Sequence, residues 1–220
     1  MEIISGKITD FGSDGSITIR ASLPNIDRAC LRRYSTVEIG LPDGRYITPE
    51  QRKKAYALIN EIADWSGDLP ENIKKLLKME FIVHRLQAIN KTVFSLSNCD
   101  VTTAKEFISY LIEFVLDNHV PVREPLYELC EDIDRYTYAC LMSKSCCVCG
   151  KKADLHHVDA IGMGNDRTEV NHIGMLALPL CRGHHNEWHN IGGSEFNSRY
   201  HIDPIKIDEA IAKKYKLKGR

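Results

Sequence analysis

Two short stretches of this 220-residue chain hold most of its metal-binding side chains. The first covers residues 145–158 and reads SCCVCGKKADLHHV, and the second covers residues 180–189 and reads LCRGHHNEWH. Seven of the nine histidines lie between His156 and His201. One structural zinc takes four ligands, so the two stretches offer more ligands than a single zinc site uses.

Pairs of ligands separated by two residues are typical of zinc sites. Cys146 and Cys149 form one such pair, and Cys181 and His184 form the second. Two close pairs of soft or borderline ligands suit a structural Zn²⁺ with tetrahedral geometry. Cys147 is an alternative to Cys146, but two intervening residues make the better zinc knuckle.

Four further histidines in the two stretches are left over. The segment CRGHHNEWH is expected to be helical, which places His185 and His189 on one face because they are four residues apart. His156 and His157 lie in the extended segment DLHHVDA, where neighbouring side chains point to opposite sides of a strand. One of them can therefore bind a second metal ion while the other does something else. A histidine with a pKa near neutrality can act as the general base that deprotonates water.

A zinc knuckle, then LHHV, then LCRGHH and a further histidine four residues on, resembles the HNH endonucleases, the ββα-metal class, over about residues 146–191. This resemblance implies that His156, His185 and His189 bind one divalent ion, which could be Mg²⁺, Mn²⁺, Ni²⁺ or Zn²⁺. It implies that His157 is the general base and that the knuckle residues hold the structural zinc. The implied reaction is metal-dependent hydrolysis of DNA phosphodiester bonds.

The sequence departs from this family's pattern at the middle asparagine. Leucine or methionine stands where that residue is expected, in the segment HIGMLALPLC. Asn171 or His172 could orient the base from a shifted position, and we name Asn171 with His157 as the catalytic residues. Arg167, in the loop GMGNDRTEV, is a candidate contact to DNA phosphate or a solvated loop charge. Trp188 is expected in the core rather than stacked on a base.

Alternating apolar and polar residues predict that the first 48 residues are mainly β-structure. EIISGKI and GSITIRA are expected strands joined by a turn, and STVEIGLPDGRYIT is expected to form two short strands around Pro-Asp-Gly. Farther along the chain, TVFSLSN is expected to be a strand or an extended segment.

Four segments have the apolar periodicity of helices. The first begins after Thr48, which is the expected cap of a capping box with Gln51, with Pro49 at the first helical position. Asp100 or Thr102 is the expected cap of the third helix. The expected helical segments are TPEQRKKAYALINEIADWSG, ENIKKLLKMEFIVHRL, TAKEFISYLIEFVLDNH and EPLYELCEDIDRYTYACLM.

The bulk composition restricts the class of protein. The net charge of −1 means that any binding of nucleic acid depends on a local patch. No run of 18 apolar residues and no secretory signal is seen, so we expect a cytoplasmic protein with no membrane association and with reduced thiols. Cys30, Cys99, Cys130 and Cys140 are then expected to be small buried residues.

The region that precedes the metal-binding stretches also has a weaker resemblance. Residues 40–142 loosely resemble phage recombination mediators of the Orf type, some of which carry a C-terminal HNH domain. This implies binding of single-stranded DNA, a homodimer and a role in phage recombination. Tyr34, Tyr46 and Phe94 could stack on bases, although packing in the core is the expected role.

Together these patterns predict an α+β protein with two parts. Residues 1–143 are expected to form a mixed α+β domain, and residues 144–220 a ββα-metal nuclease domain with a basic tail. Two alternatives remain at this point: a zinc module that binds DNA without cutting it, and a recombination mediator whose main activity is strand binding.

Overall fold

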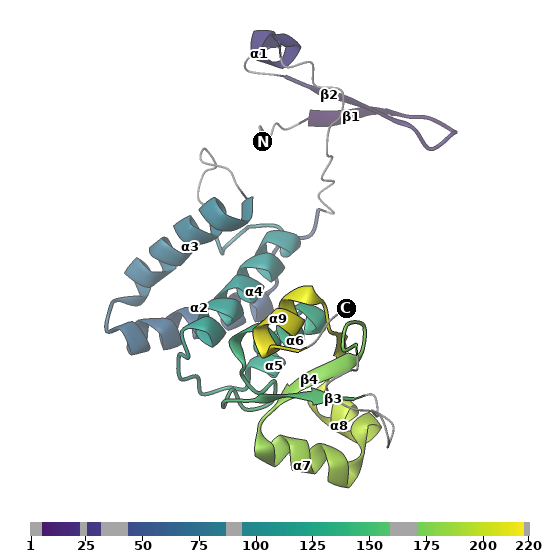
Figure 1. The fold of residues 1–220 in the computed structure, drawn as a ribbon. Coiled ribbons are helices and arrows are strands. Elements are labelled where there is room, and N and C mark those ends of the chain that lie inside the picture. Colours follow the sequence, from purple (N-terminus) through teal and green to yellow (C-terminus); the bar gives the residue numbers. More distant parts are fainter. Residues whose placement is uncertain (1–5, 23–25, 32–43, 87–93, 159–170, 218–220) are drawn as a thin grey trace.

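The computed structural model describes residues 6–22, 26–31, 44–86, 94–158 and 171–217 (Figure 1). Within them the chain has the predicted mixed α+β fold. The helices are α1 (Ile26–Leu31), α2 (Pro49–Ser66), α3 (Pro70–Leu86), α4 (Val101–Asp117), α5 (Leu126–Leu129), α6 (Ile133–Ser143), α7 (Arg182–Ile191), α8 (Gly193–Tyr200) and α9 (Glu209–Tyr215). The strands are β1 (Gly6–Phe11), β2 (Ile17–Ala21), β3 (Asp154–His157), β4 (Leu176–Leu180) and β5 (Ile205–Lys206).

The two strands expected near the N-terminus form an antiparallel hairpin. β1 pairs with β2 from Gly6 opposite Ala21 to Phe11 opposite Ile17, with an irregularity between Ile8 and Asp10. Nearly every residue of the hairpin is exposed, and in the view of Figure 1 it lies near α1 and apart from helices α2 to α9. Residues 2–5 of the first expected strand and residues 35–43 of the segment STVEIGLPDGRYIT lie outside the described residues, as does Tyr34.

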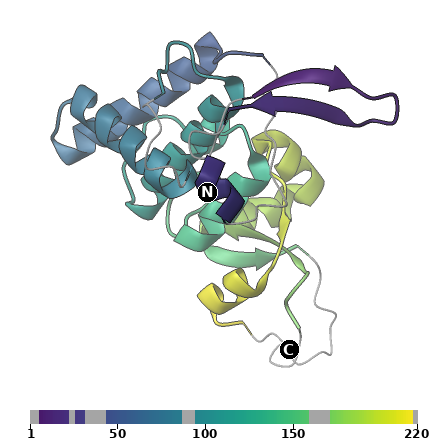
Figure 2. The same ribbon diagram turned by 90° about the horizontal axis from the view of Figure 1, so that it is seen from above.

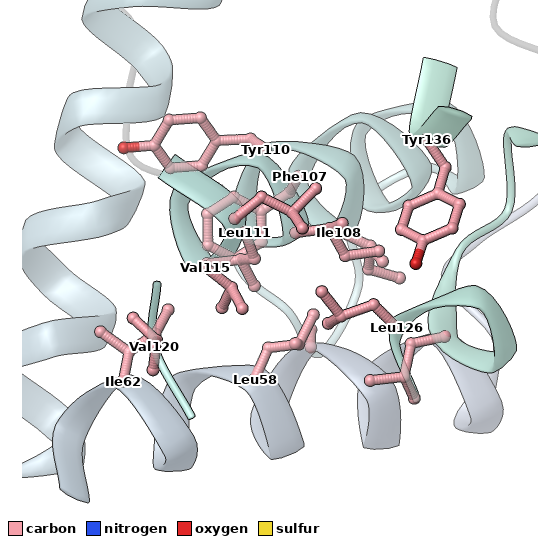
Figure 3. Close-up of a cluster of buried hydrophobic side chains, with 14 of the residues drawn as sticks. Leu58, Ile62, Phe107, Ile108, Tyr110, Leu111, Val115, Val120, Leu126 and Tyr136 are labelled. Atoms are coloured by element: carbon pink, nitrogen blue, oxygen red, sulfur yellow. The ribbon is translucent and has the colours of Figure 1, made fainter. Parts of the chain in front are cut away.

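Helix α2 begins as the sequence predicts. The Thr48 side chain accepts the N–H of Gln51 at 3.1 Å, and the Gln51 side chain accepts the N–H of Thr48 at 3.1 Å. This capping box satisfies two backbone donors that the first turn would otherwise leave open. The apolar stripe of α2, including Leu58 and Ile62, is buried against α4, whose Phe107, Ile108 and Leu111 fill the centre of the core (Figure 3).

The fourth expected helix is two helices. Cys130 has the extended conformation (φ −69°, ψ 152°) and ends α5. Asp132 then caps α6, since its side chain accepts the N–H of Arg135 at 3.2 Å. The local capping preference of aspartate therefore interrupts the helical periodicity. The third helix, α4, is capped by Asp100, one of the two expected residues.

The described part of the segment TVFSLSN is a turn rather than a strand. The N–H groups of Asn98 and Cys99 both donate to the carbonyl of Ser95. Arg52 of α2 donates to the carbonyls of Leu96 and Ser97 at 2.9 and 2.8 Å. Contacts with a helix more than 40 residues earlier thus hold this turn, and local sequence patterns do not report such contacts.

The expected burial of the four cysteines outside the metal-binding stretches, and of the aromatic residues, is only partly correct. Cys99 and Cys140 are buried and Cys130 is half-buried, but Cys30 is exposed. Phe94 lies in an aromatic cluster with Phe81 and Phe107, as expected for a core residue. The expectation was wrong for Tyr46, which is 69 % exposed and whose backbone bridges to Asp100.

A three-stranded antiparallel sheet forms the centre of the C-terminal part, with β4 between β3 and β5. Helix α7 packs on one side of this sheet, and α6 and α9 lie on the other (Figures 1 and 2). One buried cluster contains residues from before and after Ser143, such as Tyr136 and Leu178. The boundary between two domains at residue 143 stays a prediction.

None of the helices in the described ranges combines the length and the apolar character that crossing a membrane needs.

Candidate metal centres

Cys146, Cys149, Cys181 and His184 converge on one point. Their ligand atoms all lie within 4.8 Å of one another. The two sulfurs of Cys149 and Cys181 are 3.7 Å apart, and Nδ1 of His184 is 3.3 Å from Sγ of Cys181 and 3.4 Å from Sγ of Cys146. With Zn–S bonds of about 2.3 Å, two sulfurs of a tetrahedral site are about 3.8 Å apart. These separations therefore fit the edges of a zinc tetrahedron better than hydrogen bonds between thiols.

Two turns place these ligands. In the first, the Gly150 N–H donates to the Cys146 carbonyl at 2.8 Å and the Cys146 N–H donates to the Lys151 carbonyl at 2.7 Å. Gly150 has a φ of +68°, which glycine adopts without strain. In the second, Cys181 follows β4 and is the N-cap of α7, which places His184 in the first helical turn.

Burial makes the thiolate of Cys146 dependent on a cation. It raises the pKa of Cys146 to about 12, so burial alone would keep that thiol protonated. Burial also acts to raise the pKa of Cys181, but hydrogen bonds from the His184 N–H and from the neighbouring thiols bring the pKa below its usual value. A zinc ion would supply the positive charge that stabilises all three thiolates.

Cys147, the alternative ligand, has another position. It is fully buried, its N–H donates to the Pro179 carbonyl at 3.1 Å, and its carbonyl accepts the buried hydroxyl of Tyr136 at 2.7 Å. The structure places Cys146, and not Cys147, in the four-residue cluster. Cys147 instead joins the knuckle to β4 and α6.

A second cluster consists of His156 from β3 and His185 and His189 from α7. Their ligand nitrogens also lie within 4.8 Å of one another, and the ring of His156 is 4.7 Å from that of His185 and 5.2 Å from that of His189. Nε2 of His156 and Nδ1 of His185 are buried and have no hydrogen-bond partner among the described residues. Buried polar atoms of this kind need an explanation, and a divalent ion between the three rings fits them.

The electrostatics of this cluster favour the neutral imidazoles of His156 and His185. Burial, followed by the charges of His185, His189 and His157, lowers the pKa of His156 to about 4. Burial, followed by His189 and Arg182, also lowers the pKa of His185. Neutral imidazole is the form that binds metal, so the cluster is ready for an ion at neutral pH.

Trp188 forms a wall of the second cluster. Its ring centroid is 4.4 Å from that of His156, and it packs against the main core, as expected for a core residue. Gly193 makes room for it, because a Cβ on this glycine would lie 2.6 Å from the Trp188 ring. Trp188 thus limits the movement of the His156 ring, which lies on the face of β3 nearest α7.

His157 lies on the other face of β3. It is opposite Ala177, whose side chain packs with residues of α6 and α9. Nε2 of His157 is 2.9 Å from Nδ1 of His172. The two neighbouring histidines thus have different surroundings, as the strand geometry predicts.

Among the described residues, the hydrogen bond of the Asn171 side chain is a local one and does not involve His157. Asn171 is exposed, and its Oδ1 accepts the N–H of Ile173 at 3.0 Å within a local turn. The structure places its neighbour His172 beside His157, and a catalytic role for Asn171 stays a prediction. The position of His172 just before β4 is the sequence signal that could have identified it. Because β3 and β4 are antiparallel and His157 pairs with Ala177, residues just before β4 lie near the end of β3. Arg167 lies outside the described residues.

A family model described as "Putative HNHc nuclease" matches residues 28–218. The chain belongs to this HNH nuclease family. The match extends far beyond the metal-binding stretches and includes most of the helical region. No curated protein and no solved structure gave a significant match.

Proposed function

We propose that this chain is a metal-dependent DNA endonuclease that hydrolyses phosphodiester bonds. The observation that carries the proposal is the pair of adjacent histidines on β3, of which His156 joins a three-imidazole cluster while His157 faces away from it. A metal ligand and a separate base, held on one short strand, are what hydrolysis of a phosphodiester needs.

Each residue has a distinct task in this proposal. His156, His185 and His189 would hold the ion and leave its remaining positions open. When bound, a divalent ion supplies Lewis acidity that stabilises charge on the phosphate and on the leaving oxygen. His157 would take a proton from water, whose oxygen then bonds to phosphorus while the bond to the leaving oxygen breaks with its electron pair. The Cys146 cluster would hold Zn²⁺ and keep α7 against the sheet.

The test compares the two neighbouring histidines. Wild type, His157→Ala and His156→Ala are incubated with plasmid DNA and with circular single-stranded DNA across titrations of Mg²⁺, Mn²⁺, Ni²⁺ and Zn²⁺. We expect His157→Ala to lose cleavage by roughly 10²–10⁴-fold while it retains both metals. His156→Ala should lose affinity for the second metal, so that added ion partly restores cleavage. Cleavage by His157→Ala at the wild-type rate would disprove the mechanism.

We also propose that the enzyme acts on single-stranded or recombining DNA as a homodimer, in phage DNA recombination or processing. The loose resemblance of residues 40–142 to Orf-type mediators supports this role. Leu69 and the α3 residues Leu76, Met79 and Val83 are all exposed, and their spacing places them in one row along the helix. Such a row supports self-association. Leu76→Lys should then convert a dimer to a monomer in sedimentation velocity, and a wild-type monomer would contradict the dimer.

We also propose a cytoplasmic location, because the reducing conditions there keep the cysteines of the zinc cluster from forming disulfides.

A further inference from the structure

His172 occupies a defined position beside His157. The ring centroids are 4.8 Å apart with an interplanar angle of 45°, and the two nitrogens are at hydrogen-bond distance. The side chain of His172 is 6 % exposed, whereas that of His157 is half-buried. The buried ring is therefore placed to support the more accessible one.

The backbone around His172 is anchored from outside its own segment. The Met175 N–H donates to the His172 carbonyl at 3.2 Å and closes a turn. The Gly174 N–H donates to the Ile207 carbonyl at 2.8 Å, and the Ile207 N–H donates to the Met175 carbonyl at 2.9 Å. Gly174 has a φ of +88°, in the left-handed region. The C-terminal strand β5 and the residue that follows it thus hold the turn that carries His172.

The proton between the two rings decides what His157 can do. A neutral imidazole has one N–H and one lone pair. If Nε2 of His157 donates to Nδ1 of His172, the lone pair of His157 is on Nδ1 and can accept a proton from water. If His172 donates instead, the proton of neutral His157 is on Nδ1 and that nitrogen is not basic. The acceptor role of His172 therefore selects the useful tautomer of His157.

We propose that His172 is the positioning residue of His157, in the role for which the sequence lacks the expected asparagine. The inference rests on the proposed function, since it assigns His157 as the base. The side-chain geometry explains the exchange of residue types. Nδ1 of histidine and Oδ1 of asparagine are both bonded to Cγ, so an asparagine at position 172 would present an acceptor at nearly the same point.

Three substitutions at one position test this idea. His172→Ala should reduce the single-turnover cleavage rate by roughly 10–100-fold, the usual effect of losing such an orienting partner. His172→Asn should retain most of the activity, because its Oδ1 replaces Nδ1. His172→Gln should behave like His172→Ala, because its oxygen lies one bond farther from the backbone. DNA affinity, zinc content and binding of the second metal should remain at wild-type levels in all three.

A matched control is His119→Asn, at an exposed site with a φ of +51°, a conformation that asparagine tolerates. It should cleave like wild type. Wild-type rates for both His172→Ala and His172→Gln would overturn the proposal, and so would an asparagine variant as slow as the alanine variant. If His172→Ala does not fold, the asparagine and glutamine variants decide the matter.

A nuclear magnetic resonance measurement separates this inference from the proposed function. In the full-length protein loaded with Zn²⁺, nitrogen-15 shifts report which nitrogen of His157 carries the proton. A proton on Nε2 supports the acceptor role of His172, and a proton on Nδ1 overturns it. This holds even if the wild type cuts no DNA with any ion, a result that would contradict the endonuclease proposal by itself.

Discussion

The two ligand clusters share the helix α7 but differ in how they are built. The cluster of Cys146, Cys149, Cys181 and His184 uses ligands from one tight turn and from the N-terminus of α7, and presents a complete set of four. The cluster of His156, His185 and His189 joins a strand to a helix and presents three. Four ligands close a tetrahedral site, whereas three leave positions open for substrate and water.

The difference lies in which part of the fold each cluster depends on. Cys181 is at once a proposed zinc ligand, the residue that follows β4 and the N-cap of α7. His185 and His189 are one turn apart on that helix, so their positions depend on the first cluster. The reverse is not expected, because Cys146 and Cys149 lie outside α7 in a turn that has its own backbone hydrogen bonds. The first cluster is therefore expected to be necessary for the second, but not the second for the first.

The largest expected effect follows from breaking the first cluster. Cys181→Ser should lose the zinc and unfold the C-terminal part, since structural zinc contributes on the order of 10 kcal/mol to folding. Binding of the second metal should disappear with it. Metal analysis and thermal melting measure both effects, with the exposed Cys30→Ser as control. Unchanged zinc content in Cys181→Ser would show that the first cluster is assigned wrongly.

Breaking the second cluster alone should leave the first intact. His185→Ala removes one of three imidazoles, so Mn²⁺ should bind more weakly by roughly 10–100-fold while zinc content and melting temperature stay near wild type. Isothermal titration calorimetry with Mn²⁺ measures the affinity. His201→Asn, at an exposed left-handed position (φ 50°), is the control. Loss of zinc from His185→Ala would mean that the dependence between the clusters runs in both directions.

A smaller effect is expected from a change in the backbone of the turn that carries His172. Gly174→Ala places a Cβ at a φ of +88°, which costs about 1–2 kcal/mol. Nothing lies within 4 Å of that Cβ, so the strain comes from the backbone and not from a clash. The turn of His172 should shift and cleavage should slow, while both metals remain bound. Equal cleavage by Gly174→Ala and wild type would show that the base tolerates movement of this turn.

The smallest effect is expected far from both clusters. Thr48→Ala removes the capping box of α2 and should cost about 1 kcal/mol, or about 2–4 °C in melting temperature for a chain of this size. Zinc content and the cleavage rate at 25 °C should not change. A cleavage defect in this variant would show that the helical region influences the nuclease site directly.

The sequence was informative where a residue's role depends on near neighbours. The capping box of Thr48 with Gln51 and the extended segment of His156 and His157 follow from spacing and from cap chemistry alone. Asp100 is one of the two caps that the sequence left open for α4. Knuckle spacing also predicts the set of Cys146, Cys149, Cys181 and His184. The set of His156, His185 and His189 was implied by the resemblance to HNH endonucleases, and helical spacing alone predicts only that His185 and His189 share a face.

The sequence was less informative where contacts between distant segments determine the local structure. The turn at 95–99 depends on Arg52, and the position of His172 depends on pairing between β3, β4 and the residues around Ile207. The break between α5 and α6 was within reach of local reasoning. Asp132 has the chemistry of a helix cap, but the apolar periodicity on both sides of it outweighed this sign.

The buried hydroxyl of Tyr136 couples the local unfolding of α6 to that of the zinc knuckle. It donates to the carbonyl of Cys147 at 2.7 Å and so connects α6 to the zinc knuckle inside a shared core. An opening that frees the knuckle must expose this hydroxyl and break its bond, which buried polar groups resist. The amide protons of the knuckle and of α6 should therefore exchange with solvent deuterium in one cooperative event.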